Sequence, residues 1–307
     1  ENHTDAKTEI LAGITTFMTM AYILAVNPSI MAATGMDSGA VFTATALAAF
    51  IGTLLMAIFA NYPFALAPGM GLNAYFAYTV VIGMGYTWQY ALTAVFAEGI
   101  IFILLSLTNV REAIFNAIPM NLKSAVSVGI GLFIAFVGLQ NAHIVVGGST
   151  LLQLFSVEAY NKANGVEASF NNVGITVILA LAGIIITGIL VVKNIKGNIL
   201  WGILITWGLG IICQFAGLYV PNADLGFYSL LPDFSKGLSI PSLTPIFGKL
   251  QFKGIFSVDF IVILFAFLFV DLFDTIGTLV GVSAKADMLD KEGRLPHIKV
   301  SFLAYAV

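Results

Sequence analysis

Residues 265–282, FAFLFVDLFDTIGTLVGV, are apolar enough to lie in lipid, yet they include two carboxylates, Asp271 and Asp274. Residues three apart share one face of a helix, and Thr275 and Thr278 extend that face by a turn. A carboxylate at the bilayer centre costs about 2.5–3.5 kcal/mol on insertion scales. We therefore expect this face to line a bundle interior or a wet cavity that binds an ion or a polar ligand.

The composition agrees with a polytopic membrane protein. Hydrophobic residues make up 59% of the chain and charged residues 9%, with a mean hydropathy of +0.97, whereas a soluble domain is about 25% charged. The net charge of −3 and the lack of a basic tract give no sign of a nucleic-acid partner. The histidines His143 and His297 lack the spacing of metal ligands, so we expect neither a metal nor another cofactor.

A membrane helix needs about 20 mostly apolar residues, and this rule predicts an all-α protein. The predicted spans are 10–33, 40–60, 63–82, 88–107, 124–139, 173–192, 200–220 and 260–282, with a ninth beginning near Val300. The chain begins without methionine and ends within a hydrophobic run too short to span. We therefore expect a C-terminally truncated sequence of eight to nine spans.

The third span is predicted to be broken, because Pro68, Gly69 and Gly71 lie in its middle. A broken helix survives in a membrane only where it lines a cavity or is covered by protein. A helix that begins after the break would direct free N–H groups at a polar ligand. Asn73 would offer a donor and an acceptor, and Phe76 could stack on a ring. The alternative is a kink that serves only packing.

Basic residues favour a cytoplasmic N-terminus. Nine of the 13 lie in one set of alternate connections and four in the other, provided the broken segment counts as one crossing. Seven spans then precede the span with the two acids, which enters the membrane opposite to the first. This order predicts an inverted repeat with the binding site near the midplane.

Glu98 is a further acid, within span 88–107. The sequence supports two roles for Glu98 equally: a structural partner for other polar groups in the core, or a residue that relays protons. The acids at 271 and 274 could also be a buried pair satisfied by backbone and hydroxyl groups. A carboxylate in lipid loses solvation, which favours its protonated form, as proton coupling requires.

Four segments carry a resemblance to a known family: EILAGITTFMTMAYILAVNP (9–28), ALAPGMGLNAYFAY (65–78), GIGLFIAFVGLQNA (129–142) and FVDLFDTIGTLVGV (269–282). In this order they resemble the AzgA-like purine permeases of the nucleobase:cation symporter-2 (nucleobase-ascorbate transporter) superfamily. The resemblance covers nearly all 307 residues.

The resemblance implies proton-driven uptake of adenine, guanine or hypoxanthine across the cell membrane, with sodium as another candidate ion. It also implies the uracil-permease fold of two inverted sets of seven spans. The expected domains are a core over 1–107, a gate over 108–257 and the start of the second repeat over 258–307. The expected partners are a purine base and the lipid bilayer, and the assembly could be a homodimer.

When the family's functional residues are aligned with this sequence, Asp271 matches the substrate-binding acid. Asp274 matches the second acid of that motif, and Asn73 matches the polar residue after the break. We expect Asp271, Asn73, Phe76 and Gly71 to bind substrate. We expect proton coupling or support of the site from Asp271 itself and from Asp274, Thr275 and Glu98.

Three alternatives stay open. A uracil or xanthine permease, or an anion exchanger of the same fold, would share the architecture, although an anion site would prefer basic residues over paired acids. An intramembrane aspartyl protease needs two carboxylates facing each other across a water. Here both acids point the same way from one helix, so we do not expect an enzyme. A scaffold would not explain a broken helix with buried acids.

Overall fold

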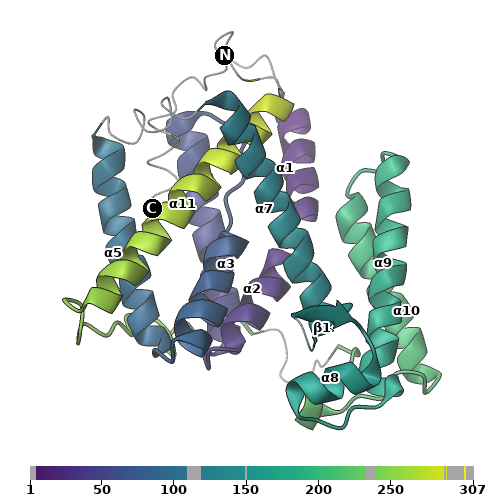
Figure 1. The fold of residues 1–307 in the computed structure, drawn as a ribbon. Coiled ribbons are helices and arrows are strands. Elements are labelled where there is room, and N and C mark those ends of the chain that lie inside the picture. The colour runs from purple at the N-terminus through teal and green to yellow at the C-terminus, as the bar shows by residue number, and fades with distance from the viewer. Residues whose placement is uncertain are drawn as a thin grey trace. The chain divides into compact units, whose positions relative to one another are not determined.

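The computed structural model of this chain describes residues 5–108, 119–148, 151–232, 239–286, 288 and 301. Its fold is mostly helical (Figure 1). The helices are α1 (Ala6–Met20), α2 (Ile23–Ala32), α3 (Ser38–Leu55), η1 (Met56–Ala60), α4 (Met70–Ala74), η2 (Tyr75–Gly83), α5 (Trp88–Leu107), α7 (Met120–Asn141), α8 (Val157–Asn164), η3 (Phe170–Gly174), α9 (Ile175–Val192), α10 (Asn198–Phe215), η4 (Ala223–Leu225) and α11 (Val258–Lys285). Strands β1 (Val145–Gly147) and β2 (Leu152–Leu154) form an antiparallel hairpin in which Val146 pairs with Gln153.

The predicted all-α membrane architecture is confirmed. Within the described residues, six helical runs are long and apolar enough to cross a membrane: Ala6–Ala32, Ser38–Ala60, Trp88–Leu107, Phe170–Val192, Asn198–Phe215 and Val258–Ser283. Two shorter apolar helices, Met70–Gly83 and Val128–Asn141, overlap the third and fifth predicted spans and end one and two residues beyond them. The predicted ninth span lies outside the described residues, apart from Ser301.

The first predicted span is interrupted, because α1 ends at Met20 and α2 begins at Ile23. The Thr19 hydroxyl donates to the carbonyl oxygens of Thr15 and Thr16, at 3.1 and 2.7 Å. Hydroxyls that bond back to their own helix in this way bend it, which is a physical reason for a break at this place.

The seventh span ends earlier than predicted, at Phe215 instead of residue 220. Gly217 has a left-handed φ of 71°, which terminates a helix. A proline disfavours the helical conformation of the residue before it, so Asn27-Pro28 predicts the end of a helix. This prediction is wrong, because both residues lie buried within α2, which continues to Ala32.

The chain divides into two compact units. The first contains residues 1–22 and 135–239, and the second contains residues 23–134 and 240–307. In the second unit α2 packs on α3, α5 packs on α11, and α4 contacts both α2 and α11. Phe76, Phe260, Ile263 and Phe267 belong to one buried cluster of this unit. The predicted assignment of 1–107 to a core and 108–257 to a gate stays a prediction.

In the first unit, α9 and α10 form an antiparallel pair held closely by small residues. A Cβ on Gly183 would lie 2.7 Å from Thr206 Oγ1, and one on Gly202 would lie 2.0 Å from Thr187 Oγ1. The two glycines therefore let each helix approach a threonine of the other. Such small-residue contacts are what hold helices together where lipid removes the hydrophobic driving force.

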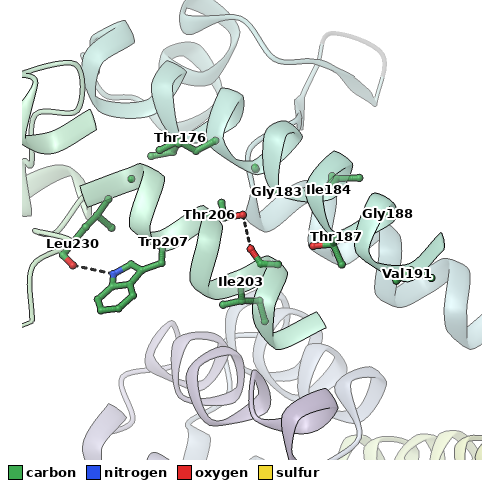
Figure 2. Close-up of a pocket in the computed structure, with 14 residues that line it drawn as sticks. Thr176, Gly183, Ile184, Thr187, Gly188, Val191, Ile203, Thr206, Trp207 and Leu230 are labelled. Carbon is green, nitrogen blue, oxygen red and sulfur yellow. Dashed lines mark hydrogen bonds between the residues drawn. The ribbon is translucent and has the colours of Figure 1, made fainter. Parts of the chain in front are cut away.

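An open groove of about 720 Å³ runs along α9 and α10 (Figure 2). Its polar groups are largely used within the protein, since Thr206 Oγ1 donates to Gly202 O at 2.7 Å and Trp207 Nε1 donates to Leu230 O at 2.9 Å. A polar base needs unsatisfied donors and acceptors, so this groove does not have the character of the predicted site.

The long connections of this unit fold into a small packed structure. Val146 from β1, Ala159 and Tyr160 from α8, and Tyr219 and Phe227 from the later connection share one buried cluster. The His143 ring lies edge-on to Tyr160, with centroids 5.0 Å apart, and 6.0 Å from the Phe227 ring.

Gly202→Ala should destabilise the α9–α10 pair, because the added methyl collides with Thr187, and overpacking typically costs about 1–3 kcal/mol. The matched control is Gly208→Ala on the same helix, where nothing lies within 4 Å of the added Cβ. We expect a lower midpoint of thermal unfolding in detergent for the first variant only. Equal midpoints would show that the close approach is unimportant.

Stability should fall as the pH drops below about 6.5, in part through His143. Burial lowers the pKa of this imidazole, so the folded state resists a proton that the unfolded chain accepts. His143→Asn should remove that part of the pH dependence, and asparagine tolerates the left-handed φ of 57° found here. The measurement is the unfolding midpoint across acidic and neutral pH, and an unchanged slope would contradict the expectation.

Candidate functional site

The break in the third span is the centre of the candidate site. Residues 61–69 form no helix, and Phe64 and Leu66 in this stretch are buried in the core. The Thr53 hydroxyl of α3 accepts a hydrogen bond from Leu66 N at 2.9 Å and lies 3.4 Å from Leu66 O. A threonine side chain thus supplies partners that a helix would otherwise provide, which is the condition for irregular backbone at membrane depth.

The prediction that a helix begins after the break is confirmed. α4 starts at Met70, and Gly69 precedes it without a side-chain cap. A Cβ on Gly69 would lie 2.8 Å from Asp274 Oδ2, which is closer than real Cβ contacts. The absence of a side chain at position 69 therefore lets the carboxylate of Asp274 on α11 reach the backbone at the start of α4.

The other predicted acids lie on helices that pack together. Asp271 is half-buried on α11, one turn before Asp274. Glu98 is buried on α5, which packs against α11. Thr275 is fully buried, and its Oγ1 has no hydrogen-bond partner within the described part of the chain. The acids and this threonine thus belong to the same unit as the break.

Asn73 lies one turn into the helix that follows the break, where its backbone N–H donates to Gly69 O at 3.1 Å. Its side-chain Nδ2 donates to Asn27 Oδ1 at 2.7 Å, and Asn27 Nδ2 donates to Thr45 Oγ1 at 2.7 Å. Asn27 and Thr45 were not among the predicted site residues. A polar residue within an apolar run, as Asn27 is, was the signal available in the sequence.

Phe76 and Gly71 sit on the same helical stretch. The Phe76 ring is buried, 6.5 Å from the Phe267 ring of α11, and the Tyr75 ring lies edge-on to Phe267 at 5.0 Å. The nearest atom to a Cβ on Gly71 would be Phe133 Cε1, 3.9 Å away. These contacts explain both residues as packing, so their predicted contact with substrate stays a prediction.

Carboxylates and amides dominate this arrangement. It offers acceptors for the N–H groups of a polar ligand, together with groups that can hold a proton. Across the described residues, no three His, Cys, Asp or Glu side chains gather closely enough to hold a metal ion. The amides and carboxylates of this site can form hydrogen bonds, and the carboxylates can also exchange protons.

Gly69→Ala should reduce substrate affinity while leaving the protein folded. The added methyl meets the end of the Asp274 side chain, which can move aside without disturbing the backbone. For the purine transport that the family resemblance implies, we expect a raised KM, with normal protein abundance in the membrane. Gly99→Ala on α5, where nothing lies within 4 Å, is the matched control. An unchanged KM in Gly69→Ala would show that the position of Asp274 does not matter for binding.

Comparison with known proteins gives several close relatives. The chain is 42% identical over 307 residues to the guanine/hypoxanthine permease PbuO and 44% identical over 313 residues to the guanine/hypoxanthine permease PbuG, both of Bacillus subtilis. It is 36% identical over 300 residues to the adenine permease AdeP of Escherichia coli. These matches cover 99%, 98% and 97% of the chain. The chain spans 65%, 64% and 61% of the relatives' own lengths.

The model of the permease family matches residues 7–305. The match confirms the resemblance to AzgA-like purine permeases, and the matched proteins are transporters instead of enzymes. The helices that carry the broken span and the two acids all fall within the matched range. On this evidence the chain belongs to the permease family.

Proposed function

We propose that the protein is a proton-coupled permease that takes up purine nucleobases across the cell membrane. The observation that carries the proposal is the Asp274 carboxylate against Gly69, because it joins an acid of α11 to the break in the third span. The names of its relatives, guanine/hypoxanthine permease and adenine permease, support a purine as the cargo.

The proposed chemistry uses the acceptors of the site. A purine base carries N–H groups in one plane. The oxygens of an ionised carboxylate accept such donors strongly, and the carbonyl oxygen remains an acceptor when the group is protonated. We assign the base and the coupled proton to Asp271, one turn before Asp274 on the same helix. Loss of solvation favours the protonated form of a carboxylate at membrane depth, so proton uptake and base binding can occur together.

Transport itself would follow an alternating-access cycle. The spans of 1–107 and the start of the second repeat at 258–307 would move as a core against a gate formed by 108–257. The intact protein would sit in the plasma or inner membrane with a cytoplasmic N-terminus, in line with its basic connections. Reorientation would carry a bound base and proton together, since leaving a lone carboxylate charge in the core is costly.

The decisive experiment is uptake of labelled hypoxanthine, guanine and adenine by cells that lack their own permeases and express the complete protein. A proton-coupled carrier should lose uptake when a protonophore collapses the gradient and keep it when sodium is replaced. The reverse pattern would assign sodium as the coupling ion. Competition by uracil, xanthine or sulfate, and not by hypoxanthine, guanine or adenine, would instead favour one of the alternative cargoes.

Asp271→Asn should lower the ratio of maximal rate to KM by roughly 10- to 100-fold, the usual effect of losing a hydrogen bond to a charged group. Asp259→Asn is the matched control, because this acid lies at the exposed start of the same helix and accepts a hydrogen bond from the Tyr86 hydroxyl at 2.5 Å. Uptake by Asp271→Asn equal to that of the parent, with the same pH dependence, would remove Asp271 from the mechanism.

A further inference from the structure

We propose that Asn27 and Thr45 fix the orientation of the Asn73 side-chain amide, so that Asn73 presents its carbonyl oxygen to the ligand. Asn73 would then accept a hydrogen bond and select a base that carries an N–H group at that point. Asn27 and Thr45 act as positioning residues and need not touch the ligand. This inference rests on the proposed function, because it assigns Asn73 to the nucleobase site.

The side chains form one continuous chain of hydrogen bonds across three helices. Asn73 of α4 donates to Asn27 of α2, Asn27 donates to Thr45 of α3, and Thr45 Oγ1 lies 2.7 Å from the carbonyl oxygen of Val41. The other two contacts are also 2.7 Å long. Asn27 and Thr45 are buried, with 6% and 2% of their surface exposed, so water does not replace these bonds. All four residues belong to the same compact unit.

The direction of this chain is set at its far end. A carbonyl oxygen carries no hydrogen, so two oxygens 2.7 Å apart attract each other only if the Thr45 hydroxyl proton lies between them. The Thr45 oxygen can then only accept a bond from Asn27, which must turn its NH₂ group toward Thr45. The same amide consequently turns its carbonyl oxygen toward Asn73.

Asn73 must meet that oxygen with its own NH₂ group. The opposite orientation would place two carbonyl oxygens 2.7 Å apart without a proton, and a buried clash of acceptors is strongly unfavourable. The Asn73 Oδ1 atom is left over, and it takes part in no hydrogen bond within the described residues. Asn73 is half-buried, and its Oδ1 is not among the fully buried polar atoms that lack a partner in the described part of the chain, so this acceptor is accessible to a ligand.

An amide without this support could rotate and offer either a donor or an acceptor. When Asn27 and Thr45 hold the Asn73 amide in this orientation, a ligand with an N–H group at this point binds more tightly. A ligand with a bare ring nitrogen or an N-methyl group in the same place binds more weakly. The Asp271 and Asp274 carboxylates can also accept hydrogen bonds from N–H groups. Hydrogen-bond acceptors on α4 and α11 would therefore recognise the base together.

The test compares Thr45→Val with Thr45→Ser in the purified complete protein. Valine has the shape of threonine but no hydroxyl, whereas serine keeps the hydroxyl and should rescue the function. Asn27→Leu breaks the chain at a second point. The probes are hypoxanthine and its 1-, 7- and 9-methyl derivatives. The first derivative lacks the N1–H group, and the other two both lack the imidazole N–H group, which hypoxanthine carries on either N7 or N9. Equilibrium binding gives, for each protein, the ratio of the Kd of a methyl derivative to the Kd of hypoxanthine.

Asn73 would contact either the N1–H group or the imidazole N–H group of the base. The ratio for the derivatives that lack this group should be about three- to tenfold smaller in Thr45→Val and Asn27→Leu than in the parent and in Thr45→Ser, the change expected for loss of one oriented neutral hydrogen bond. The ratios for the derivatives that keep this group should stay as in the parent. Hypoxanthine itself should bind more weakly to both variants. A merely structural role would reduce the amount of folded protein without changing any ratio.

Identical ratios in all four proteins would overturn the proposal. Binding with the expected change of ratio, but without cellular uptake, would support the orientation of Asn73 and contradict the transport function. If the parent protein binds none of the four bases, both the nucleobase site and this inference are wrong. Transport of purines with unchanged ratios would leave the proposed function standing and remove only the role of Asn27 and Thr45.

Discussion

Inside a bilayer, every backbone N–H and C=O group must find a partner within the protein, and residues 61–69 have no helix to provide one. The side chain of Thr53 bonds the backbone of Leu66, and Phe64 and Leu66 are buried around it. The cost of the break is met by neighbouring helices of the same unit. Because α3 and α11 must lie against this stretch to complete it, the break also decides which side chains surround it.

Glycine decides how close those helices come. At Gly69 the missing side chain admits the Asp274 carboxylate to the backbone, where any other residue would displace it. At Gly183 and Gly202 the same property lets α9 and α10 approach each other's threonines. The first contact brings a polar group to irregular backbone, whereas the second joins two regular helices. One physical property thus serves both a candidate site and a packing interface.

Much of the architecture could be predicted from hydropathy, because apolar runs about 20 residues long reveal spans directly. The break was also predictable, since Pro68 and Gly69 disturb a helix wherever they occur. Helix boundaries that depend on local hydrogen bonds were harder to predict from the sequence. Thr19 bonds its own helix beside the interruption of the first span, and Asn27 with Pro28 is accommodated inside α2, although this pair often ends a helix.

For the site, the sequence by itself determined the residue types: two acids one turn apart on an apolar helix, and a break followed by Asn73. Spacing along one helix is local, so it can be read without knowing the neighbours. Only the tertiary structure decided that Asp274 reaches Gly69, and that Asn73 bonds Asn27 and, through it, Thr45. These partners are separated by tens to hundreds of positions, and packing of whole helices brings them together. The direction of a hydrogen-bond chain exists only once those helices are in contact.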